Sequence, residues 1–133
     1  DDRTRLQAKA QALGIEDRVV FAGYVSEAEK ADHYRVADAF VMPSRGEGFG
    51  IVFLEALACG VPAIGGAFDG SREALADGRL GLLVNPDKPS ELVEAVRIAL
   101  NAHEKVPPAG IGAFSLCGFR ERVASTLSTN TRS

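Results

Sequence analysis

Four short apolar runs, each followed by a stretch with helical spacing, constrain the fold of this chain more than any other feature. Apolar residues follow one another within each run instead of alternating with polar ones, which is typical of strands buried on both faces. Strands that alternate with helices form a parallel sheet with right-handed crossovers. The sequence therefore predicts an α/β fold with a Rossmann-like parallel sheet, its strands at 18–22, 39–42, 61–64 and 80–84.

Local signals place the helices between and around these strands. A first helix ends at Gly14, and Ser26 and Glu29 have the spacing of a capping box that opens the next one. Further helices are expected at 51–59, before Gly60, and over one or two turns at 71–76. The last two helices are expected to bury apolar residues: Leu92, Val96, Ala99 and Leu100 after Pro89, and later Leu116, Phe119, Val123 and Leu127.

Length and composition indicate an ordinary globular chain. The 133 residues predict a single domain over 1–133, with a breaker loop at 104–113 and a frayed tail at 129–133. No run approaches the length of a membrane span, so membrane contact is not indicated. The formal charge of −3, with Lys and Arg scattered, argues against nucleic acid as a partner. Cys59 and Cys117 are expected to be buried thiols, which favours a reduced, cytoplasmic location.

The segment 43–50, Pro-Ser-Arg-Gly-Glu-Gly-Phe-Gly, is the most unusual in the chain. Its three alternating glycines lie between a buried strand and a helix, where glycine lets a ligand approach the backbone closely. A helix start adds unpaired N–H groups and a positive dipole end, which suit a phosphate. The pattern fits neither the dinucleotide fingerprint nor a Walker loop. It predicts an anion site, and a glycine-rich turn without a ligand is the alternative.

Two glutamates add chemistry to this segment. Glu55 interrupts an otherwise apolar helix, and a buried carboxylate is costly unless it is paired. It is expected to point toward the loop, where its two oxygens could accept hydrogen bonds from two adjacent hydroxyls, such as those of a ribose. Glu47 on the loop could do the same for a second polyol. The alternatives are an exposed helix edge for Glu55 and a solvated loop charge for Glu47.

Several blocks of the sequence, in order and at matching spacing, resemble the C-terminal domain of retaining GT-B glycosyltransferases, the group 1 or glycogen-synthase-like family. The blocks lie at 13–25, at 37–62, which holds the two glutamates with seven residues between them, and at 69–84. The resemblance implies transfer of a sugar from a nucleotide-diphosphate donor with retained anomeric configuration. It also implies that no metal and no other cofactor takes part.

The resemblance also implies roles for individual residues. Glu55 would bind the ribose hydroxyls, and Glu47, at the catalytic position, would bind the hydroxyls of the donor sugar; neither would be a nucleophile. Fixed N–H donors would stabilise the charge that develops on the diphosphate. The donor-binding residues of the loop would be Gly48, Phe49, Gly50 and Ile51, and those holding the base would be Gly23, Tyr24 and Val25.

The same family normally has two further strands and an acceptor domain upstream, so the resemblance implies four of the usual six strands and no activity without the missing part. The strand at 18–22 would then pair directly with the strand at 39–42, or another chain would fill the gap, and an open edge favours self-association. A non-catalytic module that binds nucleotide sugars or a partner is the alternative function. The base, the sugar and the acceptor stay open.

Overall fold

The computed structural model of the chain describes residues 2–46, 48–102 and 105–111. The chain divides into two compact units, residues 1–30 and 31–133. That both belong to one domain stays a prediction. The predicted final helix at 116–127, the tail at 129–133, Cys117 and the ends of the predicted breaker loop lie outside the described residues.

The first unit contains one complete helix and an extended segment, and its last residues begin a second helix. Helix α1 (Arg3–Ala12) is followed by Gly14, which has a φ of +66°, as the predicted helix end requires. A short 3-10 turn, η1 (Glu16–Arg18), comes next, and residues 19–25 form no strand. The prediction of a strand at 18–22 is therefore wrong. A strand needs a neighbour for its N–H and C=O groups, and among the described residues every strand pairing lies in the second unit.

Helix α2 (Glu27–Val36) begins as the capping box predicts. The backbone N–H of Ser26 donates to the Glu29 carboxylate at 3.3 Å, and the Ser26 hydroxyl donates to the same oxygen at 2.5 Å. The side chain of Glu29 thus satisfies a donor that the start of a helix leaves without a partner.

The sheet consists of β1 (Phe40–Met42), β2 (Ala63–Gly66) and β3 (Leu82–Val84), parallel and in that order. This confirms the α/β class, but the described sheet has three strands where four were predicted. Strand β2 starts two residues later than predicted, after Pro62, which has no N–H to give to a sheet. The predicted pairing of 18–22 with 39–42 is also wrong, since β1 pairs with β2 alone among the described strands.

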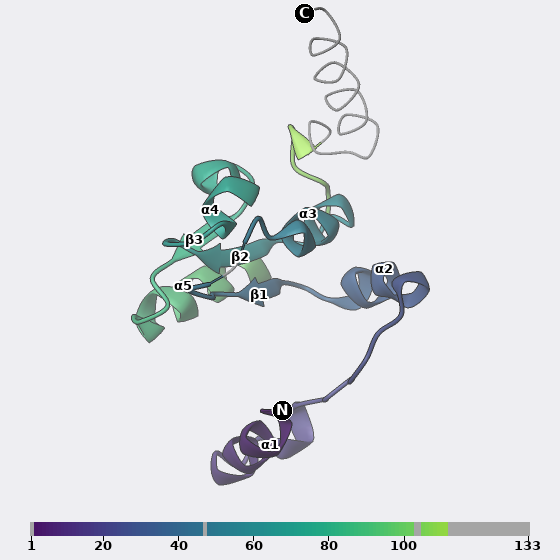
Figure 1. Ribbon diagram of the computed structural model, residues 1–133, viewed down its shortest axis with the longest axis vertical. Coiled ribbons are helices and arrows are strands. Elements are labelled where there is room, and N and C mark those ends of the chain that lie inside the picture. The colour runs from purple at the N-terminus through teal and green to yellow at the C-terminus, as the bar shows by residue number, and fades with distance from the viewer. Residues whose placement is uncertain (1, 47, 103–104, 112–133) are drawn as a thin grey trace, which may run out of the picture. The chain divides into compact units, whose positions relative to one another are not determined.

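Helices cover both faces of this sheet. Because successive residues of a strand point to opposite sides, β2 contributes to a buried cluster on each face. Ala63 joins a buried cluster with residues of α3 (Ile51–Ala58) and α4 (Ser71–Ala74), whereas Ile64 packs with β3 and α5 (Pro89–Leu100). Figure 1 shows α4 and α5 on opposite sides of the strands. The short predicted crossover is confirmed as α4 followed by a 3-10 turn, η2 (Ala76–Gly78).

Two predictions of burial need correction. Helix α5 begins at Pro89 as predicted and buries Ala95 and Ala99, but Leu100 is 57% exposed, so its assignment to the core is wrong. The core-facing side of α5 is centred on Ala95 and Ala99, and a residue one position further turns about 100° away. Cys59 is a free thiol that is half-buried rather than buried. No helix in the described ranges is both long and apolar enough to cross a membrane.

Candidate functional site

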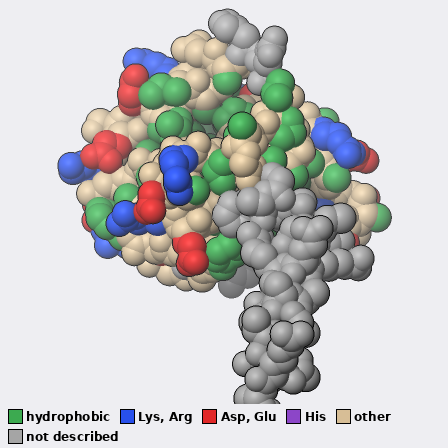
Figure 2. Space-filling model, turned by 90° about the horizontal axis from the view of Figure 1, so that it is seen from above, with side chains coloured by type: hydrophobic (Ala, Val, Ile, Leu, Met, Phe, Trp, Pro, Cys, Tyr) green, Lys and Arg blue, Asp and Glu red, His purple; other side chains and the backbone are tan. Residues whose placement is uncertain are grey.

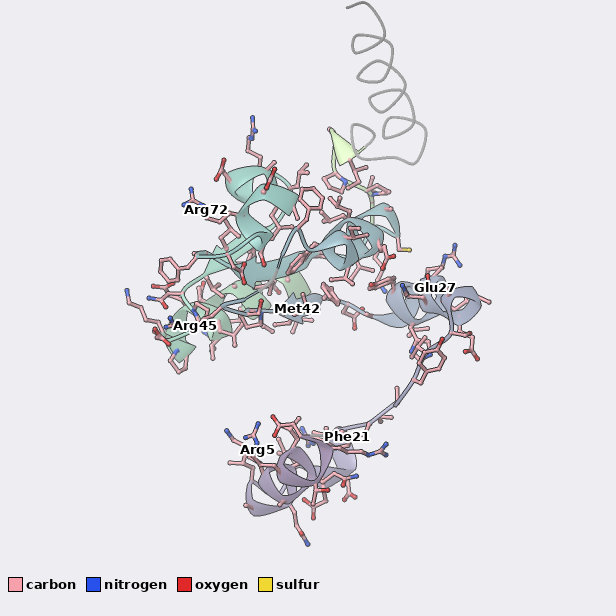
Figure 3. The ribbon with its side chains drawn as sticks, in the orientation of Figure 1. Arg5, Phe21, Glu27, Met42, Arg45 and Arg72 are labelled. Carbon is pink, nitrogen blue, oxygen red and sulfur yellow. The ribbon has the colours of Figure 1, made fainter. Side chains whose placement is uncertain are left out.

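Three loops leave the carboxyl ends of the strands, at 43–50 after β1, 67–70 after β2 and 85–88 after β3. Ligands of open parallel sheets bind at this end. The Ser44 hydroxyl donates to the Asp69 carboxylate at 2.8 Å, and the Arg45 guanidinium forms an ion pair with Asp87. Met42 and Arg45 are labelled at this end in Figure 3. The first loop is therefore tied to both of the others.

The glycine-rich loop enters α3 as the sequence predicts. Gly50 has a φ of +75° and immediately precedes the helix, which begins at Ile51. This is the left-handed region, which glycine adopts without strain. The first N–H groups of a helix have no partner within it and lie at its positive end. Phe49 and Ile51 are exposed on either side of Gly50, which is itself buried.

The two glutamates differ in what the structure describes. Glu55 lies in α3 and is half-buried, so it is not the exposed helix edge of the alternative prediction. The Tyr34 hydroxyl of α2 donates to its Oε2 at 3.0 Å. Glu47 lies outside the described residues, and its predicted contact with the donor sugar stays a prediction.

Sequence reasoning missed Tyr34, because nothing in the spacing of α2 marks it. Its ring packs edge-on against Phe40 with the centroids 5.7 Å apart, and Phe40 packs in the same way against Phe53 of α3 at 5.5 Å. Aromatic contacts of this kind are favourable beyond their buried area. This row of rings fixes the Tyr34 hydroxyl beside the Glu55 carboxylate.

Sequence reasoning also missed Asp69, although an Asp-Gly pair after a buried strand marks a turn. One oxygen of its carboxylate accepts from the Ser44 hydroxyl, and the other accepts from the N–H of Ser71 at 2.9 Å. Beside it, a Cβ at Gly66 would lie 2.2 Å from the carbonyl oxygen of Ser44. The first loop therefore rests directly on the end of β2.

The three residues predicted to hold a base lie in the first unit. Gly23 has a φ of +70°, and the side chain of Tyr24 is 91% exposed. Val25 is half-buried. Because each unit is described by itself, a base site at these residues stays a prediction.

The loop after β3 is held by a carboxylate of α5. The N–H of Asn85 donates to Glu91 at 2.9 Å, and the Asn85 side chain accepts from the N–H of Asp87 at 3.0 Å. The Asn85 N–H, aided by Lys88, lowers the pKa of the Glu91 carboxyl below its ordinary value. This loop also carries the partner of Arg45.

The stability of this loop is expected to depend on pH. A carboxyl whose pKa is lower in the folded chain stabilises the fold above its unfolded pKa of about 4.3, and the contribution is lost as the pH falls through the folded value. We expect the free energy of unfolding to fall on acidification below about pH 4.3, and less steeply in Glu91→Gln. Urea unfolding at a series of pH values measures this, with Glu94→Gln as the control on the same helix. Equal slopes for wild type and Glu91→Gln would contradict it.

Acidic and basic side chains are interspersed over the visible face of the chain in Figure 2. This agrees with the near balance of 15 Lys and Arg against 18 Asp and Glu. Ion pairs such as those of Arg72 with Asp77 and Lys88 with Glu91 join neighbouring charges.

Comparison with known proteins relates this arrangement to one family. Residues 1–107 match the family described as Glycosyl transferases group 1. D-inositol 3-phosphate glycosyltransferase 2 of Catenulispora acidiphila is 38% identical over 133 residues, which cover 98% of this chain and 31% of that protein.

Two other relatives are similar over shorter stretches. D-inositol 3-phosphate glycosyltransferase of Geodermatophilus obscurus is 42% identical over 115 residues, covering 84% of this chain and 25% of that protein. GDP-mannose-dependent alpha-(1-6)-phosphatidylinositol monomannoside mannosyltransferase of Mycolicibacterium smegmatis is 39% identical over 98 residues, covering 68% of this chain and 26% of that protein. The chain thus spans 25% to 31% of the length of these relatives.

Proposed function

We propose that this chain, which belongs to the family Glycosyl transferases group 1, forms the donor-binding part of a site that transfers a sugar from a nucleotide-diphosphate sugar to an acceptor. The observation that carries the proposal is the glycine-rich loop at the carboxyl end of β1, which leads into the start of α3. Transfer with retention of the anomeric configuration, and without a metal ion, is part of the proposal.

The diphosphate would bind at the start of α3. When the bond between sugar and diphosphate breaks, negative charge grows on the diphosphate while the sugar becomes oxocarbenium-like. Donors fixed in place before the reaction stabilise such a charge without reorganising. The backbone N–H groups of Phe49, Gly50 and Ile51, together with the dipole of α3, are the donors we assign to it.

The ribose would bind to Glu55. A carboxylate has about four acceptor positions on its two oxygens, and the Tyr34 hydroxyl uses one of them. Tyr34 therefore orients the carboxylate. Two adjacent ribose hydroxyls match the two oxygens, which is the reason for assigning this role to Glu55.

The remaining groups of the donor are assigned by the family resemblance. Glu47 would bind the hydroxyls of the sugar, and Gly23, Tyr24 and Val25 would hold the base. The name of the Mycolicibacterium relative makes GDP-mannose one donor to test, and the names of the inositol 3-phosphate glycosyltransferases make an inositol phosphate the acceptor class to test.

Calorimetric titration with UDP-, GDP- and ADP-sugars in the presence of EDTA tests the proposal. We expect one of these donors to bind, and Glu55→Ala to raise its dissociation constant about 100-fold or more, because two hydrogen bonds to a charged group are lost. Binding that requires a metal ion would contradict the metal-free part of the proposal. The absence of binding to any donor would contradict its core.

Two further variants separate ribose binding from packing. Glu94→Ala changes an exposed glutamate of α5 and is expected to leave the dissociation constant unchanged. Tyr34→Phe keeps the ring and the Glu55 carboxylate but removes the hydroxyl, so we expect a much smaller loss than in Glu55→Ala. Equal losses in Tyr34→Phe and Glu55→Ala would show that the pair acts through packing and not through the ribose.

A further inference from the structure

We infer that Asp69 is a positioning residue, which holds the base of the glycine-rich loop through Ser44 and thereby keeps the N–H groups of the loop in place for the diphosphate. The inference rests on the proposed function, because the ligand of the loop is taken to be the nucleotide-diphosphate donor. Its evidence is independent of that function and consists of the contacts between the loops after β1 and β2.

The carboxylate of Asp69 is itself fixed. Its Oδ1 accepts from the N–H of Ser71 at 2.9 Å, so the turn that opens α4 sets its orientation. Its Oδ2 accepts from the Ser44 hydroxyl at 2.8 Å, a partly buried hydrogen bond that joins residues 25 positions apart. A hydrogen bond to an ionised acceptor is stronger than a neutral one, and partial burial strengthens it further.

The backbone of Ser44 is fixed at the same place. Its N–H donates to the carbonyl of Met42 at 2.9 Å. Its carbonyl oxygen would lie 2.2 Å from a Cβ at Gly66, so the two backbones are in contact because residue 66 has no side chain. The side chain of Ser44 is thus positioned by Asp69 after β2, and its backbone by the last residues of β1 and β2.

Gly46 and Gly48 have no such support. Apart from their chain neighbours, no described atom lies within 4 Å of a Cβ built at either position. The ion pair of Arg45 with Asp87 joins side chains that are 58% and 62% exposed, and such surface pairs contribute little. A glycine-rich segment loses much backbone entropy when it becomes ordered. Fixing its first residue lowers that cost before the donor binds.

The test compares Ser44→Ala, which removes the hydroxyl, with Ser44→Thr, which keeps one. We expect Ser44→Ala to raise the dissociation constant of the donor about tenfold, as for the loss of one hydrogen bond to a charged group, and Ser44→Thr to restore it. In an Asp69→Ala background, Ser44→Ala should add no further loss, because the two residues act through one bond. The inference would be overturned if the losses of donor affinity in Ser44→Ala and Asp69→Ala were fully additive, or if Ser44→Thr did not restore the affinity.

Two controls separate an effect on the loop from a general loss of stability and from a failure of donor binding. Val96→Ala weakens the packing of α5 against the sheet, at a position outside the glycine-rich loop. The variant should bind the donor with the dissociation constant of wild type, even if its melting temperature is lower. Amide hydrogen exchange without a donor tests the loop alone, and the amides of Gly48, Phe49 and Gly50 should exchange about tenfold faster in Ser44→Ala. Unchanged exchange overturns the inference whether or not a donor binds. Changed exchange in a chain that binds no donor would instead overturn the proposed function.

Discussion

Gly66→Ala is expected to lower the free energy of unfolding by about 3 kcal/mol, at the upper end of what an added methyl group costs in a packed interior. The new Cβ would lie 2.2 Å from the carbonyl oxygen of Ser44 and 3.3 Å from its carbonyl carbon. Both are backbone atoms, so no side chain can rotate away. Strand β2 is buried along its whole length, which leaves it little room to shift. Urea unfolding followed by circular dichroism measures the loss.

Gly46→Ala is the matched control, since no described atom lies within 4 Å of a Cβ at that position. We expect its free energy of unfolding to stay close to that of wild type. Gly66→Ala should also weaken donor binding, because the carbonyl of Ser44 must move and the glycine-rich loop moves with it. A wild-type unfolding curve for Gly66→Ala would show that the close approach of the glycine-rich loop to the end of β2 is wrong.

Phe53→Ala is expected to cost about 3–5 kcal/mol, the usual range for removing a large aromatic side chain from a core. Phe53 is completely buried, packs in the cluster formed by α3, β2 and α4, and contacts the ring of Phe40 edge-on. The variant leaves a cavity under α3, the helix that carries Glu55. Donor binding should therefore fall together with stability.

Phe68→Ala provides the comparison, since that ring is 64% exposed. We expect its unfolding free energy to change by about 0.5 kcal/mol or less, as for an ordinary surface substitution. Differential scanning calorimetry of both variants gives the comparison. Similar melting temperatures for Phe53→Ala and wild type would contradict the assignment of Phe53 to the core.

The sheet was predictable where apolar runs find a parallel neighbour. The runs around Phe40 and Leu83 became β1 and β3, which pair on either side of the fully buried β2. The expected burial on both faces holds for β2 but not for β1, where Val41 is 40% exposed. The run at 18–22 is apolar after Arg18 but pairs with no strand among the described residues, and Val20 is 88% exposed. An apolar run indicates that a segment favours burial, whereas it contains no information about the strand that must lie beside it.

The local backbone of the candidate site was predictable. Glycines at 46, 48 and 50 after a strand predict a turn into a helix, and the structure places Gly50, with its positive φ, directly before α3. That this turn binds an anion stays a prediction. The contacts of Tyr34 with Glu55 and of Ser44 with Asp69 join residues 21 and 25 positions apart. Such pairs depend on how α2, α3 and the loops pack, and no local spacing specifies them.

The hydrogen bond between Tyr34 and Glu55 also gives the chain an optical signal of its own. The sequence has two tyrosines and no tryptophan, so its ultraviolet emission comes from Tyr24 and Tyr34. Tyr24 is 91% exposed and is open to a dissolved quencher, whereas Tyr34 is half-buried beside the carboxylate. If the proposed ribose binding to Glu55 holds, a bound hydroxyl changes the surroundings of the Tyr34 phenol. Donor binding would then be measurable by fluorescence in the unlabelled chain.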